Sequence, residues 1–225
     1  MTASRLRLAC ALLAAGAGCS SASLAARRSL PPPPASADRA GAPEAGGAGP
    51  AHATGRDPDA ASRNREARVA VETASSLVGR RSLTVGGVDW GAGCTALVRV
   101  SMARAGHPLP PAVTDAAGLH AWAERRGALR AGRRLEPGDV VFLADRPGGA
   151  PAHAGLVARA DPDGTAVVLH RVARGVARVR LNLAWPTRTN DPATGRLVND
   201  TLYVGRQAVP AGNLVVGVAD LFGRS

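Results

Sequence analysis

Three side chains with the chemistry of acyl transfer lie in the middle part of this 225-residue chain: Cys94, His153 and His170. A glycine-rich segment ends at Gly93 and a helical apolar pattern follows, so Cys94 is expected at a helix N-terminus. The unpaired N–H groups and the positive dipole end of a helix stabilise both a thiolate and an oxyanion. An imidazole can take the thiol proton and later pass it to a leaving amine. Cys94 is therefore the candidate nucleophile and His153 the candidate general base.

His170 is expected to lie beside His153 on a pair of antiparallel strands. The sequence Asp-Pro-Asp-Gly at 161–164 separates two apolar runs and is typical of a hairpin turn. Such a turn pairs residue 153 with about residue 172, and it places residue 170 diagonally across on the same face. His170 would then orient the imidazole of His153 and complete a Cys-His-His triad. The alternatives are a buried structural cysteine and histidines that point to solvent.

Residues next to the candidate nucleophile could contact a substrate. Gly93 leaves room for a substrate backbone, and Thr95 follows the cysteine directly. Trp90 either lines a cleft or packs beneath the loop. A zinc site built from the cysteine and the two histidines is an alternative, because one thiolate and two imidazoles can leave one coordination position open. No C-x-x-C or H-E-x-x-H spacing supports that site, so we expect no metal and no cofactor.

The elements that must position these residues change in type along the chain. Apolar residues recur at helical spacing in three segments of the first half, each followed by a glycine, at 67–78, 94–105 and 115–126. The second half has short apolar or alternating runs with turn signals between them, at 140–143, 154–160, 165–172, 176–183 and 201–206. A last apolar segment, 214–222, is either a strand or a helix. Helices followed by antiparallel strands predict an α+β fold.

The first residues of the chain predict export. Arg5 and Arg7 precede an apolar run that is too short to remain as a membrane span. Residues 1–19 are therefore interpreted as a signal peptide. Cys19 follows Gly-Ala-Gly in a sequence that resembles a lipobox, which makes it a candidate lipidation site for membrane anchoring, with ordinary cleavage slightly further along as the alternative. We expect a protein of the periplasm, the outer membrane or the cell surface.

Composition separates a spacer from one folded domain. Residues 20–65 are rich in Ala, Gly, Pro and Arg and lack core-forming side chains, so they are predicted to be a disordered spacer. Residues 66–225 suffice for one domain and contain a single cysteine, which leaves no internal disulfide framework. The net charge of +11 favours an anionic polymer as partner, but no RNA-binding motif or zinc-finger spacing predicts nucleic acid binding. We expect a monomer.

Four segments of the chain form a pattern shared with one group of enzymes. They are Trp-Gly-Ala-Gly-Cys-Thr-Ala-Leu-Val at 90–98, Ala-Gly-His-Pro-Leu-Pro at 105–110, Leu-Glu-Pro-Gly-Asp-Val-Val-Phe at 135–142 and His-Ala-Gly-Leu-Val at 153–157. This order resembles CHAP domains (cysteine, histidine-dependent amidohydrolases/peptidases) and NlpC-type cell-wall peptidases. His170 falls near the third polar residue of these groups. The resemblance covers about residues 68–172.

The resemblance implies a papain-like fold, in which helices pack against an antiparallel sheet and the nucleophile begins a helix. It also implies an exported cysteine peptidase or amidase that cleaves peptide or amide bonds of peptidoglycan through a thioester acyl-enzyme. Gly93 stands where NlpC-type enzymes usually have Asp, and with Thr95 after the cysteine it favours the CHAP pattern. A catalytically inactive wall-binding lipoprotein and an acyltransferase on the same fold are the alternatives.

Overall fold

The computed structural model describes residues 58–132 and 134–223. They form an α+β structure, in agreement with the class expected from the sequence. The helices are α1 (Pro58–Ser76), α2 (Ala96–Arg104) and α3 (Ala116–Arg125). The candidate signal peptide, Cys19 and most of the expected spacer lie outside the described residues. Within the described part, no helix is both long enough and apolar enough to cross a membrane.

Small apolar residues at helical spacing bury one face of α1. Ala67, Ala70 and Ala74 are each 3% exposed or less, which confirms the periodicity seen in the sequence. Glycines with positive φ follow all three helices as expected, for example Gly79 after α1. The helix nevertheless begins at Pro58, well before the expected domain boundary at residue 66. None of residues 59–66 is buried, so apolar periodicity could not reveal the first turns.

The central sheet is antiparallel throughout. Its strands are β3 (Val140–Ala144), β4 (Pro151–Ala160), β5 (Thr165–Val172), β6 (Gly175–Asn182) and β9 (Val215–Ala219), in the order β6-β5-β4-β3-β9. Gly155 pairs with His170, which is the register expected from the turn at 161–164. The sequence predicted that His153 directly precedes this strand. Instead, β4 begins at Pro151, so His153 lies inside the strand.

Two small hairpins flank the sheet. β1 (Thr84–Val85) and β2 (Val88–Asp89) form the first, directly before the nucleophile segment. β7 (Thr201–Val204) and β8 (Gln207–Pro210) form the second, which leads through a 3-10 turn, η1 (Ala211–Leu214), into β9. The last apolar segment is thus a strand. The sequence did not predict β8, because Val209 is its one fully buried residue.

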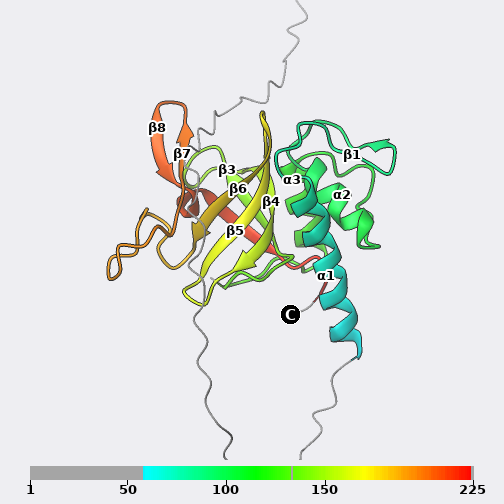
Figure 1. Cartoon of the computed structure of the whole chain (residues 1–225), viewed down its shortest axis with the longest axis horizontal. Helices are drawn as coiled ribbons and strands as arrows, with labels where there is room; N and C mark the ends of the chain where they lie inside the picture. The colour runs from blue at the N-terminus through cyan, green and yellow to red at the C-terminus, as the bar shows by residue number, and fades with distance from the viewer. Residues whose placement is uncertain (1–57, 133, 224–225) are drawn as a thin grey trace, which may run out of the picture.

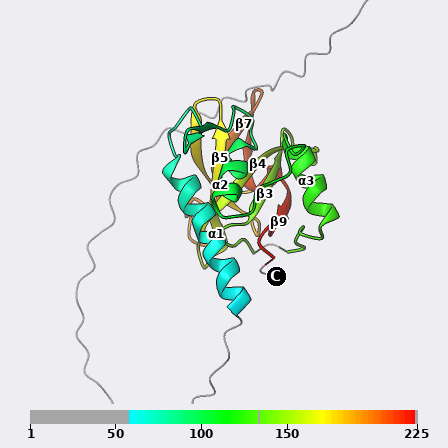
Figure 2. The same ribbon diagram turned by 90° about the vertical axis from the view of Figure 1, so that its right-hand side faces the viewer.

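The sheet is the middle of three layers. The helices cover one side and the β7–β8 hairpin lies on the other (Figure 1). Figure 2 shows the three helices in front of the sheet. Phe142 and Ala154 belong to the apolar cluster under the helices, whereas Leu143 and Val157 belong to a second cluster that includes Leu202 of β7. We call these two surfaces of the sheet the helix-side face and the hairpin-side face.

Candidate active site

Cys94 lies in the turn that leads into α2. The N–H of Ala96 donates to the carbonyl oxygen of Gly93 over 3.1 Å, and Thr95 is the N-cap with helical φ and ψ. The glycine-to-helix junction expected from the sequence is therefore present. The thiol of Cys94 is half-buried and donates to the carbonyl oxygen of Ala152 at 3.4 Å. Ala152 directly precedes His153, so the sulfur reaches the strand that carries the candidate base.

Two residues near Cys94, Thr95 and Trp90, pack into the structure, and a third, Gly93, leaves space beside the thiol. The hydroxyl of Thr95 is buried and donates to the carbonyl oxygen of Thr114 at 2.7 Å, so its side chain fixes the turn and does not face a substrate. Trp90 packs against the helix-side cluster, and its buried Nε1 has no hydrogen-bond partner among the described residues. Gly93 is exposed and meets nothing closer than 3.7 Å at its Cβ position, so it leaves space next to the thiol.

A carboxylate that the sequence did not reveal binds the imidazole of His153. The Nε2 atom of His153 lies 2.8 Å from Oδ1 of Asp145, which follows the end of β3. A carboxylate only accepts hydrogen bonds, so Nε2 carries the hydrogen in the neutral ring and Nδ1 keeps its lone pair. Nδ1 is buried and has no hydrogen-bond partner among the described residues. The arrangement supplies a histidine with a fixed tautomer and an available basic nitrogen.

His170 meets His153 as expected, but through its ring edge. The two ring centroids are 5.2 Å apart and the rings are nearly perpendicular, at 80°. His170 is 4% exposed, and neither of its ring nitrogens has a hydrogen-bond partner in the described ranges. Burial, and to a smaller extent the nearby charge of His153, lower the pKa of His170 to about 3. His170 is thus neutral near pH 7, and it positions His153 by packing, while the hydrogen bond comes from Asp145.

A glycine in β4 makes room for this packing. Gly155 lies directly opposite His170 in the ladder. A Cβ at this position would come within 2.5 Å of Cγ1 of Val168 and 2.9 Å of the carbonyl oxygen of Leu169. Any larger residue would displace β5, and with it the ring of His170.

The end of β4 contains a bulge between the thiol and the imidazole. His153 pairs with Leu143 but Pro151 pairs with Ala144, so Ala152 is the extra residue. Pairing with Leu143 puts His153 on the hairpin-side face, together with His170. Cys94 packs against the helix-side cluster. The two side chains therefore lie on either side of the bulged peptide at the end of the strand.

The zinc alternative requires Cys94, His153 and His170 to converge on one point. Among the described residues, no three His, Cys, Asp or Glu side chains are grouped so that they could hold a metal ion. The groups at this site that could take part in chemistry are the thiol, the two imidazoles and the carboxylate of Asp145.

Comparison with known proteins adds little to this geometry. No protein-family model matches the chain, and no curated protein matches it. The chain is similar to a solved structure described as "The crystal structure of Ly7917", with 17% sequence identity and a TM-score of 0.38. The similarity covers 65% of this chain and 62% of the chain of known structure, so it spans less than two thirds of the length of that second chain. A similarity at this level carries no conclusion about function.

Proposed function

We propose that this protein is an exported cysteine hydrolase that cleaves peptide or amide bonds in peptidoglycan, on a papain-like fold. The observation that carries the proposal is the meeting of the Cys94 thiol with the residue before His153, at 3.4 Å from Sγ to the Ala152 carbonyl oxygen. The imidazole beside this contact has one nitrogen on a carboxylate and the other buried without a partner in the described part of the chain. That is the electronic state that a general base requires.

In the proposed reaction, Nδ1 of His153 accepts the proton of the Cys94 thiol and the sulfur attacks a substrate carbonyl carbon. Backbone N–H groups of the turn into α2 stabilise the oxyanion. The C–N bond then breaks, and His153 passes its proton to the departing amine, which leaves a thioester. His153 next takes a proton from water, the hydroxide adds to the thioester, and the thiolate leaves and regains a proton. The products are a carboxylic acid and an amine.

This reaction requires the sulfur and Nδ1 to come within hydrogen-bond distance around the bulged end of β4. Catalytic hydrogen bonds commonly tighten only in the substrate complex. Asp145 and His170 restrict the imidazole from two sides, and Gly93 leaves the approach to the thiol open. The support for peptidoglycan as the substrate is the resemblance of the four sequence segments to cell-wall peptidases, together with the features of an exported chain.

The position of His153 on the hairpin-side face favours one second candidate. A non-catalytic wall-binding domain would keep the same fold with its thiol and imidazole separated by the bulge. Such a domain would bind purified sacculi without releasing fragments, and its thiol would react no faster than an ordinary cysteine.

The test is digestion of purified sacculi by the wild type and by Cys94→Ala. The proposal predicts soluble muropeptides from the wild type and none from Cys94→Ala, with equal thermal unfolding of the two proteins as the control for folding. Fragment masses identify the bond that is cut, and they separate hydrolysis from transfer of the acyl group to another amine or alcohol. Equal release by both proteins would rule out Cys94 as the nucleophile.

A further inference from the structure

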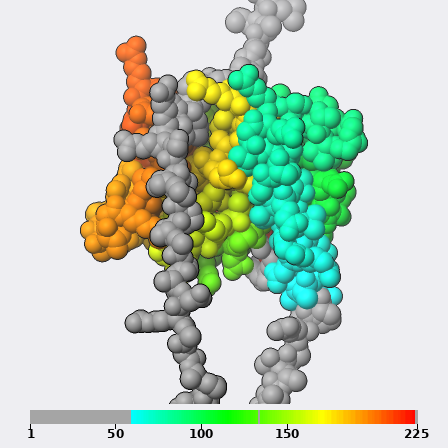
Figure 3. Space-filling view, in the orientation of Figure 1, coloured from blue at the N-terminus to red at the C-terminus, as the bar shows by residue number. Residues whose placement is uncertain are grey.

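Four arginines from two distant parts of the chain meet at one corner of the molecule. We call them the arginine cluster: Arg80 and Arg81 follow α1, Arg171 lies near the end of β5, and Arg174 lies in the β5–β6 turn. Two backbone hydrogen bonds join the two segments. The N–H of Gly79 donates to the carbonyl oxygen of Val176 at 2.8 Å, and the N–H of Val176 donates to the carbonyl oxygen of Arg80 at 3.1 Å. In Figures 1 and 3, the tip of the β5–β6 hairpin lies beside the segment that follows α1.

Close packing holds the cluster in place. Nη2 of Arg171 donates to the carbonyl oxygen of Arg81 at 2.8 Å. The backbone approaches so closely that a Cβ on Gly175 would lie 2.6 Å from the carbonyl oxygen of Arg80, and its φ of +124° also favours glycine. The backbone of both segments and the side chain of Arg171 are therefore fixed by the fold, and Arg80, Arg81 and Arg174 extend from this backbone as exposed side chains.

Among the residues that the structure describes, the arginine cluster has no acidic partner. Within the described ranges, no carboxylate lies within ion-pair distance of Arg80, Arg81, Arg171 or Arg174. Some other arginines of the described residues are paired: Arg130, Arg159 and Arg196 each have a carboxylate partner, and Arg196 binds Asp161 and Asp163 of the β4–β5 turn at 3.0 Å each. The cluster differs in that four unpaired arginines are brought to one place by the backbone contacts. Uncompensated like charges repel one another in the compact state and attract anions.

The cluster borders the proposed active site. Arg171 directly follows His170 in β5, and His170 packs on His153. Successive residues of a strand are about 3.3 Å apart along its axis. Arg171 is two residues after Leu169 in the same strand, so their side chains face the same side of the sheet. Leu169 belongs to the helix-side cluster, as Cys94 does, so Arg171 lies on the same side of the sheet as Cys94. A polymer that reaches Cys94 would therefore pass close to the arginine cluster.

We propose that the arginine cluster anchors an oxyanion of the polymer that is cleaved at Cys94, either a carboxylate or a phosphodiester group. Guanidinium groups bind both through paired N–H donors. The inference rests on the proposed function for the identity of the polymer. Substrates that lack negative charge near the scissile bond bind weakly to such a surface, and neutralising the polymer releases the protein.

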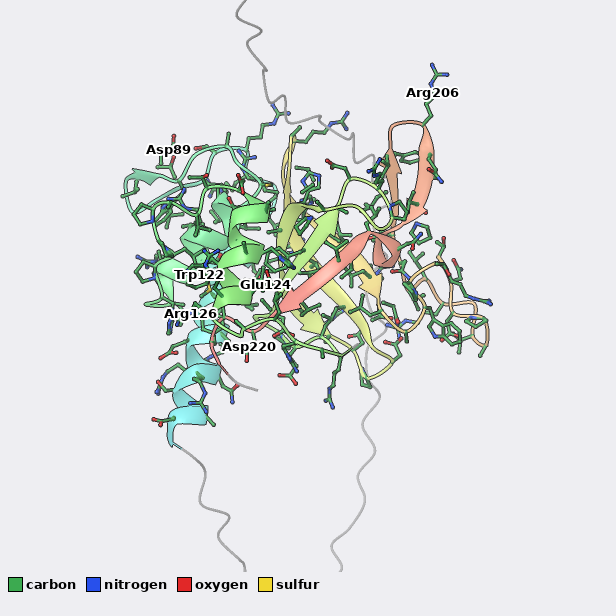
Figure 4. All side chains as sticks on the ribbon, turned by 180° about the vertical axis from the view of Figure 1, so that it is seen from behind. Asp89, Trp122, Glu124, Arg126, Arg206 and Asp220 are labelled. Carbon is green, nitrogen blue, oxygen red and sulfur yellow. The ribbon has the colours of Figure 1, made fainter. Side chains whose placement is uncertain are left out.

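Binding to sacculi in the Cys94→Ala background tests the proposal without turnover. The test variant adds Arg81→Gln and Arg174→Gln, both exposed residues. The matched control adds Arg125→Gln and Arg206→Gln, which remove the same charge from two other exposed places. Arg125 ends α3, and Arg206 lies at the tip of the β7–β8 hairpin (Figure 4). Loss of two exposed ion pairs is expected to weaken binding about two- to thirtyfold in the test variant, and the control should bind like the parent.

Three polymer samples identify the anion: native sacculi, sacculi stripped of phosphodiester-linked polymers with hydrofluoric acid, and sacculi whose carboxyl groups are amidated. Loss of binding to stripped sacculi assigns a phosphodiester, and loss of binding to amidated sacculi assigns a carboxylate. Equal binding to all three, equal loss in the control variant, or tighter binding to DNA than to sacculi would overturn the proposal. Because Cys94 is absent in this background, these outcomes are independent of whether the wild type cleaves peptidoglycan.

Discussion

Two pairs of polar residues in this molecule differ strongly in how many of their buried polar atoms are hydrogen-bonded. The first pair is Asn182 and Asn199, which bind the backbone of the loops around the end of β6. Asn199 is fully buried, and its Oδ1 accepts from the N–H groups of Asn182 and Gly212, at 2.9 Å each. Its Nδ2 donates to the carbonyl oxygens of Trp185 and Arg188. In the second group, three buried ring nitrogens of His153 and His170 have no hydrogen-bond partner among the described residues.

The two pairs of residues differ in whether a structural role explains their burial. Buried polar atoms are nearly always hydrogen-bonded, and each buried group that is not bonded requires an explanation. The two asparagines are explained by the loops that they hold together. The histidines hold no loop, and they lie beside a thiol and a carboxylate. The proposed function assigns the histidine pair to reactivity, and the hydrogen bonds of the asparagine pair assign that pair to stability.

Replacing the candidate base should separate activity from stability most strongly. His153→Ala removes the group that accepts the thiol proton, so fragment release from sacculi is expected to fall about 10²- to 10⁴-fold. Thermal unfolding should change little, because the ring is partly exposed and makes one hydrogen bond to an exposed carboxylate. His107→Gln, at a distant half-exposed histidine, is the control and should retain full activity. A His153→Ala protein with wild-type activity would remove this residue from the mechanism.

Replacing Asn199 should do the opposite. Asn199→Ala leaves buried backbone groups without partners, and each such group costs about 1–3 kcal/mol. We expect a loss of roughly 3 kcal/mol in the free energy of unfolding, measured by urea denaturation, because some groups regain water. Activity per folded molecule should remain unchanged. Full stability together with lost activity would reverse the roles that we assign to the two groups.

The pH dependence of stability should reveal the buried His170. Its folded pKa of about 3 lies below the ordinary value of 6.5, so between these values the unfolded chain binds the extra proton. Stability is therefore complete above pH 6.5 and falls with decreasing pH, by up to about 1.4 kcal/mol per unit. Unfolding measured from pH 6.5 to pH 5, above the range of ordinary carboxyl groups at about 4, should show this slope. The slope should become flatter in His170→Gln and persist in His120→Gln. The same slope in both variants would contradict its assignment to His170.

Replacing Asp145 should have the smallest effect. Its side chain is 62% exposed, so its interaction with His153 is screened by solvent. Exposed pairs of this kind are worth about 0.2–1 kcal/mol, which corresponds to at most about a fivefold loss of activity in Asp145→Asn. Asp145→Glu should recover part of that loss. An Asp145→Asn protein with activity at the level of Cys94→Ala would show that the carboxylate takes part more directly.

The parts of the fold with strong local periodicity could be predicted from the sequence. The alanine stripe of α1 and the turn at 161–164 determine a helix and a hairpin register from neighbouring residues alone. The early start of β4 could not be predicted, because Pro151 and Ala152 have no strand signal. Pro151 joins the sheet by pairing with Ala144 of β3, and Ala152 is carried along as the bulged residue. β8 is likewise set by its pairing with β7 and not by its own residues.

The site could be predicted in part, for a similar reason. The sequence proposes candidate residues by their chemistry, and its hairpin register correctly brings His153 and His170 together. It does not reveal Asp145, because an aspartate after a strand looks like a turn residue until the pairing of β3 with β4 is known. The bulge at Ala152 is also a property of that pairing, and it decides how the thiol and the imidazole face each other.

The rate at which iodoacetamide alkylates Cys94 tests the central claim most directly. A thiol without assistance has an ordinary pKa of about 8.5 and reacts slowly near pH 6. If His153 takes its proton, the wild type should be alkylated rapidly near pH 6 and His153→Ala should lose that rate, while both react at similar rates near pH 9. Identical pH profiles for the two proteins would show that the imidazole does not reach the sulfur, and would contradict the account.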